Sequence, residues 1–193
     1  MNRRSHKSDI ITIPNLLSLF RLGLIPVYAS LYLKAVLPAQ YRTAGLLMSL
    51  SCLTDLADGW IARRFHMVST LGKILDPLAD KLTQLVLTVL LSIQYPVLRP
   101  VLILLLVKEM AQLILAVHYF RHGKMLPGAL NAGKICTAVL FISLIYLVMF
   151  PTLAGPMANI IALTDGVFLI LSFVQYLMAY WGPHPMLQDL PSE

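Results

Sequence analysis

Four aspartates stand at fixed intervals in one short stretch of the sequence. The stretch reads D-x2-D-G-x2-A-R-x8-G-x3-D-x3-D and comprises Asp55, Asp58, Gly59, Ala62, Arg63, Gly72, Asp76 and Asp80. It holds four of the nine acidic residues of the chain. Carboxylates gathered this closely repel one another, and divalent cations that prefer hard oxygen ligands, such as Mg²⁺ or Mn²⁺, would neutralise them. The spacing therefore predicts a metal site.

The first half of this pattern fits one face of a helix. At about 100° per residue, four positions lie within about 100° of one another, with Arg63 at their margin: Asp55, Asp58, Gly59 and Ala62. The two small residues would leave the backbone open beside the carboxylates, so that a bulky ligand can lie flat against the helix. Close packing of membrane helices is the alternative interpretation of Gly59 and Ala62.

The second half of the pattern predicts another acidic helix face. Asp76 and Asp80 are one turn apart, and the connection before them allows two antiparallel helices to bring both acid pairs together. Two metal ions about 3.5–4 Å apart would then favour phosphoryl chemistry, because metals clamp a diphosphate and orient an attacking hydroxyl. Two alternatives remain open. One is a cation or proton site of a transporter, and the other is a set of structural ion pairs with Arg63, Arg64, Lys73 and Lys81.

The composition is typical of an integral membrane protein, because 58% of the residues are hydrophobic and only 12% are charged. Apolar runs of about 20 residues predict six membrane helices, near residues 14–33, 43–63, 74–94, 98–120, 134–151 and 156–181. These runs lack the alternation of barrel strands, so the expected fold class is all-α, a polytopic helical bundle. We expect one domain over residues 1–193.

The basic residues predict how the chain is oriented in the membrane. Nine of them flank one side of the predicted spans: Arg3, Arg4, Lys7, Arg63, Arg64, Lys73, Arg121, Lys124 and Lys134. Three lie in the opposite loops: Lys34, Arg42 and Arg99. The positive-inside rule then places both termini and the acidic pattern at the cytoplasmic side of a membrane, for which we expect a bacterial cell membrane. Dispersed basic residues at helix ends suit lipid headgroups, so nucleic acid is not an expected partner.

The stretch from Asp55 to Asp80 resembles, at every fixed position, the signature of the CDP-alcohol phosphotransferases. The resemblance implies six membrane helices, usually in a homodimer, around a cytoplasm-facing site for two Mg²⁺ or Mn²⁺ ions. It also implies transfer of a phosphatidyl group from CDP-diacylglycerol to an alcohol, with release of CMP. A small cation-coupled transporter, the alternative of another class, would bind no CDP-lipid.

The resemblance assigns roles residue by residue. Asp55 and Asp76 would bridge both metal ions, and Asp58 would bind one of them. Asp80 would bind the other ion and act as the general base that accepts the proton of the alcohol. CDP-diacylglycerol would contact residues of the pattern and of the first helix, namely Asn15, Ser18, Arg21, Gly59, Ala62, Arg63 and Ser69. Taken alone, Asn15 fits a helix cap equally well.

The residues beyond the second aspartate pair bear on the acceptor. The run P-L-A-D-K resembles the branch that uses glycerol 3-phosphate or phosphatidylglycerol. Lys108 with Glu109, and the segment around Lys134, resemble motifs of phosphatidylglycerophosphate synthases, so we expect glycerol 3-phosphate to bind Lys108 and Lys134. Ala116 and Cys136 stand where those enzymes carry cations. A cardiolipin synthase, with phosphatidylglycerol as acceptor, is therefore the alternative.

Overall fold

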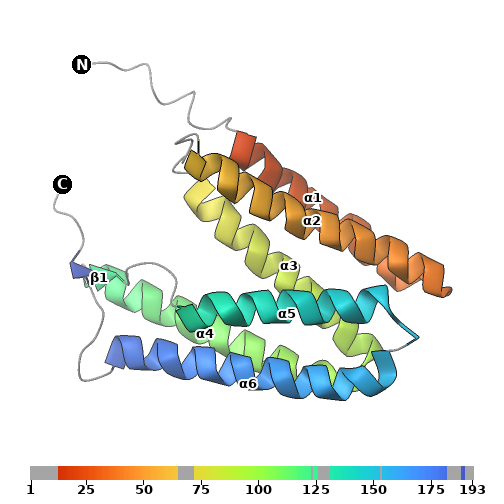
Figure 1. The fold of residues 1–193 in the computed structure, drawn as a ribbon. Coiled ribbons are helices and arrows are strands. Elements are labelled where there is room, and N and C mark those ends of the chain that lie inside the picture. Colours follow the sequence, from red (N-terminus) through yellow and green to blue (C-terminus); the bar gives the residue numbers. More distant parts are fainter. Residues whose placement is uncertain are drawn as a thin grey trace. The chain divides into compact units, whose positions relative to one another are not determined.

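The computed structural model describes residues 13–64, 72–122, 124–125, 131–152, 154–181 and 188–189. These residues form six α-helices (Figure 1): α1 (Ile13–Lys34), α2 (Pro38–Arg64), α3 (Gly72–Gln94), α4 (Arg99–Arg121), α5 (Asn131–Met149) and α6 (Ala154–Trp181). A 3-10 turn, η1 (Pro96–Leu98), precedes α4. The short strands β1 (Lys124–Met125) and β2 (Gln188–Asp189) pair antiparallel. The all-α fold class is confirmed, and each predicted apolar run coincides with a helix.

The start of α2 shows where the sequence-based boundaries differ from the structure. The second run was expected from residue 43, whereas α2 begins at Pro38. Proline suits the first position of a helix, because its missing N–H has no intrahelical partner there. The Gln40 side chain accepts hydrogen bonds from the backbone N–H groups of Val36 (2.7 Å) and Leu37 (3.0 Å). These polar contacts close the turn between α1 and α2, and hydropathy alone does not detect them.

The chain divides into two compact units. The first contains Met1–Leu91 and Ile145–Ala154, and the second contains Ser92–Leu144 and Gly155–Glu193. In the first unit α1 packs along α2. The end of α5 approaches α2 at Gly45, where an added Cβ atom would lie 2.7 Å from Met149 Sδ. The single domain expected over residues 1–193 stays a prediction.

In the second unit, tyrosines connect α4 to α6. The Tyr119 hydroxyl donates to the carbonyl oxygen of Tyr180 at 3.3 Å, and the two ring centroids are 4.8 Å apart. The Tyr176 hydroxyl lies 3.1 Å from the Tyr180 hydroxyl and 3.3 Å from the carbonyl oxygen of Gln112. Aromatic rings with polar ends therefore hold α4 and α6 together near the C-terminal ends of both helices.

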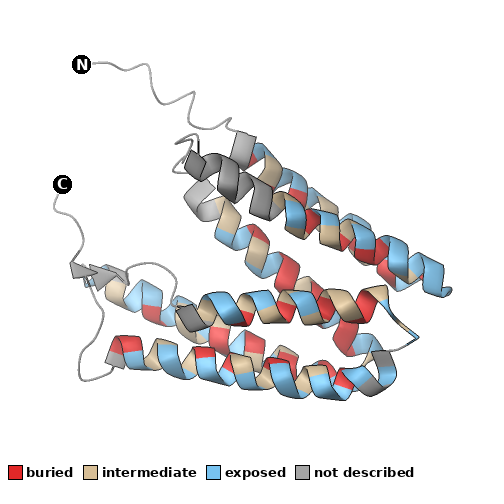
Figure 2. Cartoon of the chain, viewed as in Figure 1, coloured by how far each residue is buried: buried red, intermediate tan, exposed pale blue. Residues whose placement is uncertain are grey.

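Polar side chains are buried among apolar ones in the helix packing, and many large apolar side chains are exposed. In α1, Ser18 is fully buried while Leu16 is 64% exposed; in α6, Asp165 is fully buried while Leu163 is 72% exposed. Figure 2 shows buried, intermediate and exposed positions mixed along the helices. Lipid solvates an apolar exterior, whereas polar groups in a membrane need partners inside the protein. The burial pattern is that of a membrane protein.

Three segments of the described chain are long and apolar enough to cross a membrane: Asn15–Lys34, Pro96–Tyr119 and Met157–Tyr180. The apolar part of α5, Gly133–Met149, is shorter. The three long segments confirm the membrane class. Six complete crossings stay a prediction.

Candidate active site

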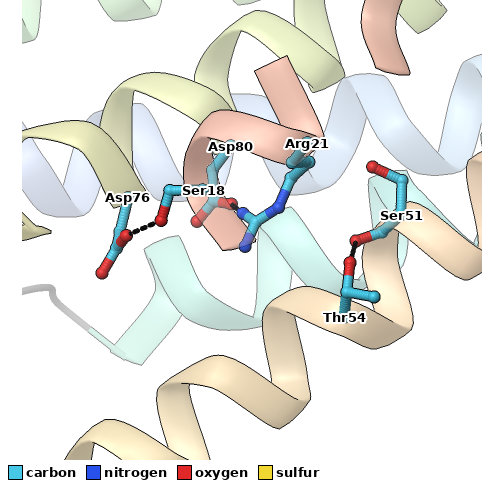
Figure 3. Close-up of polar contacts among 6 residues, drawn as sticks. All are labelled: Ser18, Arg21, Ser51, Thr54, Asp76 and Asp80. Carbon is cyan, nitrogen blue, oxygen red and sulfur yellow. Dashed lines mark hydrogen bonds and ion pairs between the residues drawn. The ribbon is translucent and has the colours of Figure 1, made fainter. Parts of the chain in front are cut away.

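Two polar residues of α1 contact the two aspartates of α3 (Figure 3). Ser18 Oγ donates a hydrogen bond to Asp76 Oδ1. Arg21 Nη1 lies 2.6 Å from Asp80 Oδ1 and forms an ion pair with it. Ser18 precedes Arg21 in α1, and Asp76 precedes Asp80 in α3. The order of the two contacts is therefore the same in both helices, so α1 and α3 run in the same direction here. This is the direction that an intervening antiparallel α2 requires.

The polar residues of α1 recur every third position and are all buried. Asn15, Ser18 and Arg21 have 1%, 0% and 1% of their surface exposed, whereas Leu19 and Phe20 between them are exposed. Residues three apart lie on one side of a helix, so this spacing builds a polar face that points into the protein. Asn15 is the third residue of α1, inside its first turn.

The ion pair joins a buried cation to a partly accessible anion. The Arg21 side chain is 2% exposed and the Asp80 side chain is 39% exposed. A buried guanidinium needs an anionic partner, because unpaired burial of a charge is strongly unfavourable. Asp80, in contrast, keeps part of its carboxylate open to a ligand, and its open side is suited to binding a metal ion or an alcohol.

The other half of the acidic pattern lies on α2. The bounds of α2 include Asp55, Asp58, Gly59, Ala62 and Arg63. Their side chains lie outside the described part of the chain, as does all of Ser69. Nearer the middle of α2, Ser51 is buried, and its carbonyl oxygen accepts a hydrogen bond from Thr54 Oγ1 at 2.7 Å (Figure 3). The shared face of the α2 residues stays a prediction.

The α3 aspartates have the chemistry that a hard divalent cation needs. Their carboxylate oxygens, four residues apart, are donors of the kind that Mg²⁺ and Mn²⁺ prefer. Within the described part of the chain, no three His, Cys, Asp or Glu side chains converge. The predicted four-carboxylate site therefore depends on the α2 side chains, and the α3 half is the part that the structure describes.

The two lysines expected to bind the acceptor have different surroundings. The Lys108 side chain, on α4, is 7% exposed, and its Nζ lies 3.1 Å from Glu109 Oε1. Lys134, near the start of α5, is exposed. Cys136, two residues further, is buried. Lys108 thus already has an anionic partner, whereas the exposed ammonium of Lys134 is accessible to a soluble anion.

A buried contact in the second unit was not predicted from the sequence. Ser143 Oγ, on α5, lies 2.9 Å and 2.8 Å from the two carboxylate oxygens of Asp165 on α6. Asp165 is an acid inside an apolar stretch of the sequence, but no spacing rule connects it to a serine 22 residues away. The contact shows how the polar interior of this unit joins α5 to α6.

Comparison with known proteins places this arrangement in a family. The family model of CDP-alcohol phosphatidyltransferases matches residues 11–181, which run through both compact units. A cardiolipin synthase (CMP-forming) of Streptomyces coelicolor is 33% identical over 69% of this chain and 63% of its own length. The rat cardiolipin synthase (CMP-forming) is 42% identical over 64% of this chain and 39% of its own length.

A relative with another name is matched over most of both proteins. The CDP-diacylglycerol--glycerol-3-phosphate 3-phosphatidyltransferase of Aquifex aeolicus is 31% identical over 86% of this chain and 94% of its own length. The matches to the two cardiolipin synthases, in contrast, span less than two thirds of those proteins. Because the family model covers most of the sequence, the chain belongs to the CDP-alcohol phosphatidyltransferase family.

Proposed function

We propose that this chain transfers the phosphatidyl group of CDP-diacylglycerol to glycerol 3-phosphate, giving phosphatidylglycerophosphate and CMP. The observation that carries the proposal is the contact of Ser18 and Arg21 on α1 with Asp76 and Asp80 on α3. It brings residues assigned to the CDP-lipid next to residues assigned to metal and base. Membership of the family and the names of relatives that use CDP-diacylglycerol support the same reaction.

The reaction needs one bond to form and one to break. The acceptor oxygen bonds to the phosphorus of the phosphatidyl group, and the bond from that phosphorus to the bridging oxygen of CMP breaks. Asp80 takes the proton of the acceptor hydroxyl, and its partly exposed carboxylate suits this role. Two Mg²⁺ or Mn²⁺ ions, when bound, neutralise the diphosphate and the carboxylates. Four residues would hold them: Asp55, Asp58, Asp76 and Asp80.

CDP-diacylglycerol would bind across the cytoplasmic halves of α1 and α2. The buried polar face of α1 supplies an amide, a hydroxyl and a guanidinium, from Asn15, Ser18 and Arg21. Hydroxyl and guanidinium groups are donors that suit phosphate oxygens. The remaining contacts in this proposal come from Gly59, Ala62, Arg63 and Ser69.

The acceptor could also be phosphatidylglycerol, and one observation favours this second candidate. Lys108 is buried and paired with Glu109, and neither Ala116 nor Cys136 can offer a cation. The dianionic phosphate of glycerol 3-phosphate would then have few cationic side chains to bind it. Lys134 remains exposed and is the acceptor contact that we retain as the principal one.

The proposed setting is a homodimer in a bacterial cell membrane, with the site open to the cytoplasm. The parallel course of α1 and α3 supports a common side for the starts of both helices. The nine basic residues on that side of the spans, against three on the other, support the cytoplasm as that side.

Purified protein in detergent tests the acceptor directly. CDP-diacylglycerol and Mg²⁺ are supplied with glycerol 3-phosphate, phosphatidylglycerol, serine or inositol in turn, and the lipid product and CMP are measured. We expect phosphatidylglycerophosphate with the first acceptor only, and no product after chelation of the metal. Formation of cardiolipin from phosphatidylglycerol would show that phosphatidylglycerol, and not glycerol 3-phosphate, is the acceptor. Failure to bind or cleave CDP-diacylglycerol would instead favour the transporter interpretation.

A further inference from the structure

Arg21 pairs with a carboxylate that is also assigned to a metal ion. Arg21 Nη1 lies 2.6 Å from Asp80 Oδ1, so the guanidinium charge sits next to a carboxylate assigned to a divalent cation. Two cations sharing one carboxylate repel each other, and the repulsion is weakly screened because the arginine is buried. Arg21 therefore opposes metal binding for as long as Asp80 is its partner.

Arg21 cannot escape this conflict by turning towards water. Its side chain is 2% exposed and belongs to the buried polar face of α1. A buried guanidinium whose carboxylate also binds a metal ion is stabilised by a further anion beside it. The diphosphate of a CDP-lipid is such an anion, and its oxygens match the forked geometry of a guanidinium.

The neighbouring contact is different in kind. Ser18 donates a neutral hydroxyl hydrogen bond to Asp76, so it places no positive charge beside that carboxylate. A hydroxyl can also rotate and share its carboxylate with a cation. The conflict between protein and metal thus arises at Asp80 and not at Asp76.

We propose that Arg21 couples the two ligands of the site: it weakens metal binding until the CDP-lipid arrives and its diphosphate takes over the guanidinium. This inference rests on the proposed function for the identity of the lipid. It adds that Arg21 is a positioning residue whose exchange of partner makes metal and CDP-lipid bind cooperatively. An enzyme built in this way holds its metal firmly only when the substrate that the metal must activate is present.

The test measures Mn²⁺ binding rather than turnover. Free Mn²⁺ is followed by electron paramagnetic resonance during titration of the purified full chain, with and without CDP-diacylglycerol and with no acceptor present. The variants are Arg21→Gln and, as a matched control, Arg42→Gln. Arg42 is exposed and lies 13 residues before Asp55 on the same helix, a distance of about 20 Å along the axis.

Arg21→Gln should bind Mn²⁺ about five-fold or more tightly than the wild type in the absence of lipid, because the opposing charge is gone. CDP-diacylglycerol should raise Mn²⁺ affinity in the wild type, and the rise should be at least about five-fold smaller in Arg21→Gln. Arg42→Gln should match the wild type in both titrations. Unchanged or weaker Mn²⁺ binding by Arg21→Gln without lipid would overturn the proposal.

A second variant covers the case in which Arg21→Gln does not fold. Arg21→Lys keeps the buried positive charge but loses the fork, so it should bind Mn²⁺ without lipid as weakly as the wild type. Its response to CDP-diacylglycerol should be smaller than that of the wild type. Tight Mn²⁺ binding by Arg21→Lys without lipid would contradict the proposal. The titrations without lipid report the effect of the Arg21 charge on metal binding, whatever reaction the protein catalyses. If the proposed reaction is wrong, the separate sign is that no CMP is released.

Discussion

Asp80 combines pairing to a buried cation with partial exposure. It is paired with a buried arginine, and it keeps part of its side chain accessible. Pairing lowers the cost of placing an acid close to the bilayer, while accessibility allows it to accept a proton from a substrate. Asp76 is held by a neutral hydroxyl instead. The two acids of α3 thus have partners of different charge.

Replacing Asp80 with asparagine should lower turnover by about 10²–10⁴-fold, the usual contribution of a positioned general base. The amide keeps the shape of the carboxylate but cannot take the proton of the alcohol. Binding of CDP-diacylglycerol should stay largely intact, because its contacts lie elsewhere in α1 and α2. Turnover is measured as CMP release at saturating acceptor, and lipid binding by CMP competition. A variant that turns over at the wild-type rate would remove Asp80 from the role of base.

Lys134→Gln should raise the KM for glycerol 3-phosphate by about ten-fold while leaving that for CDP-diacylglycerol nearly unchanged, since a charge-assisted contact to the acceptor phosphate is lost. Lys108→Gln should have a smaller effect, because Lys108 is already paired with Glu109. Lys34→Gln is the control, since Lys34 is exposed at the far end of α1. Equal KM values for Lys134→Gln and the control would exclude Lys134 from the acceptor site.

At the scale of the helices, two features hold the first unit together: the parallel course of α1 and α3, and a close approach of α5 to α2 at a glycine. α1 and α3 lie parallel at the site because α2 returns the chain between them. α2 and the end of α5 approach closely at Gly45, where a Cβ atom would meet Met149 Sδ at 2.7 Å and Val148 Cγ1 at 3.2 Å. A larger residue there has to push the end of α5 away.

Gly45→Leu should therefore destabilise the protein by about 1–3 kcal/mol, the usual cost of overpacking. Gly23→Leu is the matched control, because no other side chain or distant backbone lies within 4 Å of a Cβ added at this exposed position of α1. Thermal unfolding in detergent measures both variants. Equal unfolding temperatures for Gly45→Leu and Gly23→Leu would show that the end of α5 moves aside without loss of stability.

The sequence predicted the helices better than it predicted their contacts. The apolar runs identified the six α-helices of the described chain, because length and hydropathy are local properties. The spacing of Asp76 and Asp80 also predicted one face of α3. The contact of Arg21 with Asp80 joins residues 59 apart in sequence, and no local pattern specifies which polar residue of α1 meets which acid. Resemblance assigned Arg21 to the lipid, and the structure adds its ion pair with the proposed base.

At the scale of the whole molecule, the pattern of buried and exposed residues limits where charged residues can lie. Many large apolar residues are exposed on the helices, and the buried positions carry serine, threonine, arginine, lysine and aspartate beside the apolar core. Charged residues that have no partner inside the helix packing are expected at the ends of the helices, outside the apolar part of the membrane. By the positive-inside rule, their uneven distribution between the two ends predicts the orientation of the protein.

Both termini should face the cytoplasm. A fluorescent protein that matures only in the cytoplasm, fused after Glu193, should fluoresce in bacterial cells, while a periplasmic phosphatase fused there should be inactive. Fusions placed in the turn between α1 and α2 should give the opposite result. Active phosphatase at the C-terminus would reverse the orientation and move the site away from the cytoplasm.

The central claim is that CDP-diacylglycerol is cleaved at the acidic site between α1 and α3. It is tested most directly by CMP release from CDP-diacylglycerol with Mg²⁺ and glycerol 3-phosphate, comparing the wild type with Asp76→Asn. The account predicts CMP from the wild type and a loss of at least about 10²-fold in the variant, which lacks a carboxylate assigned to both metal ions. Equal rates of CMP release, or no CMP from the wild type, would contradict it.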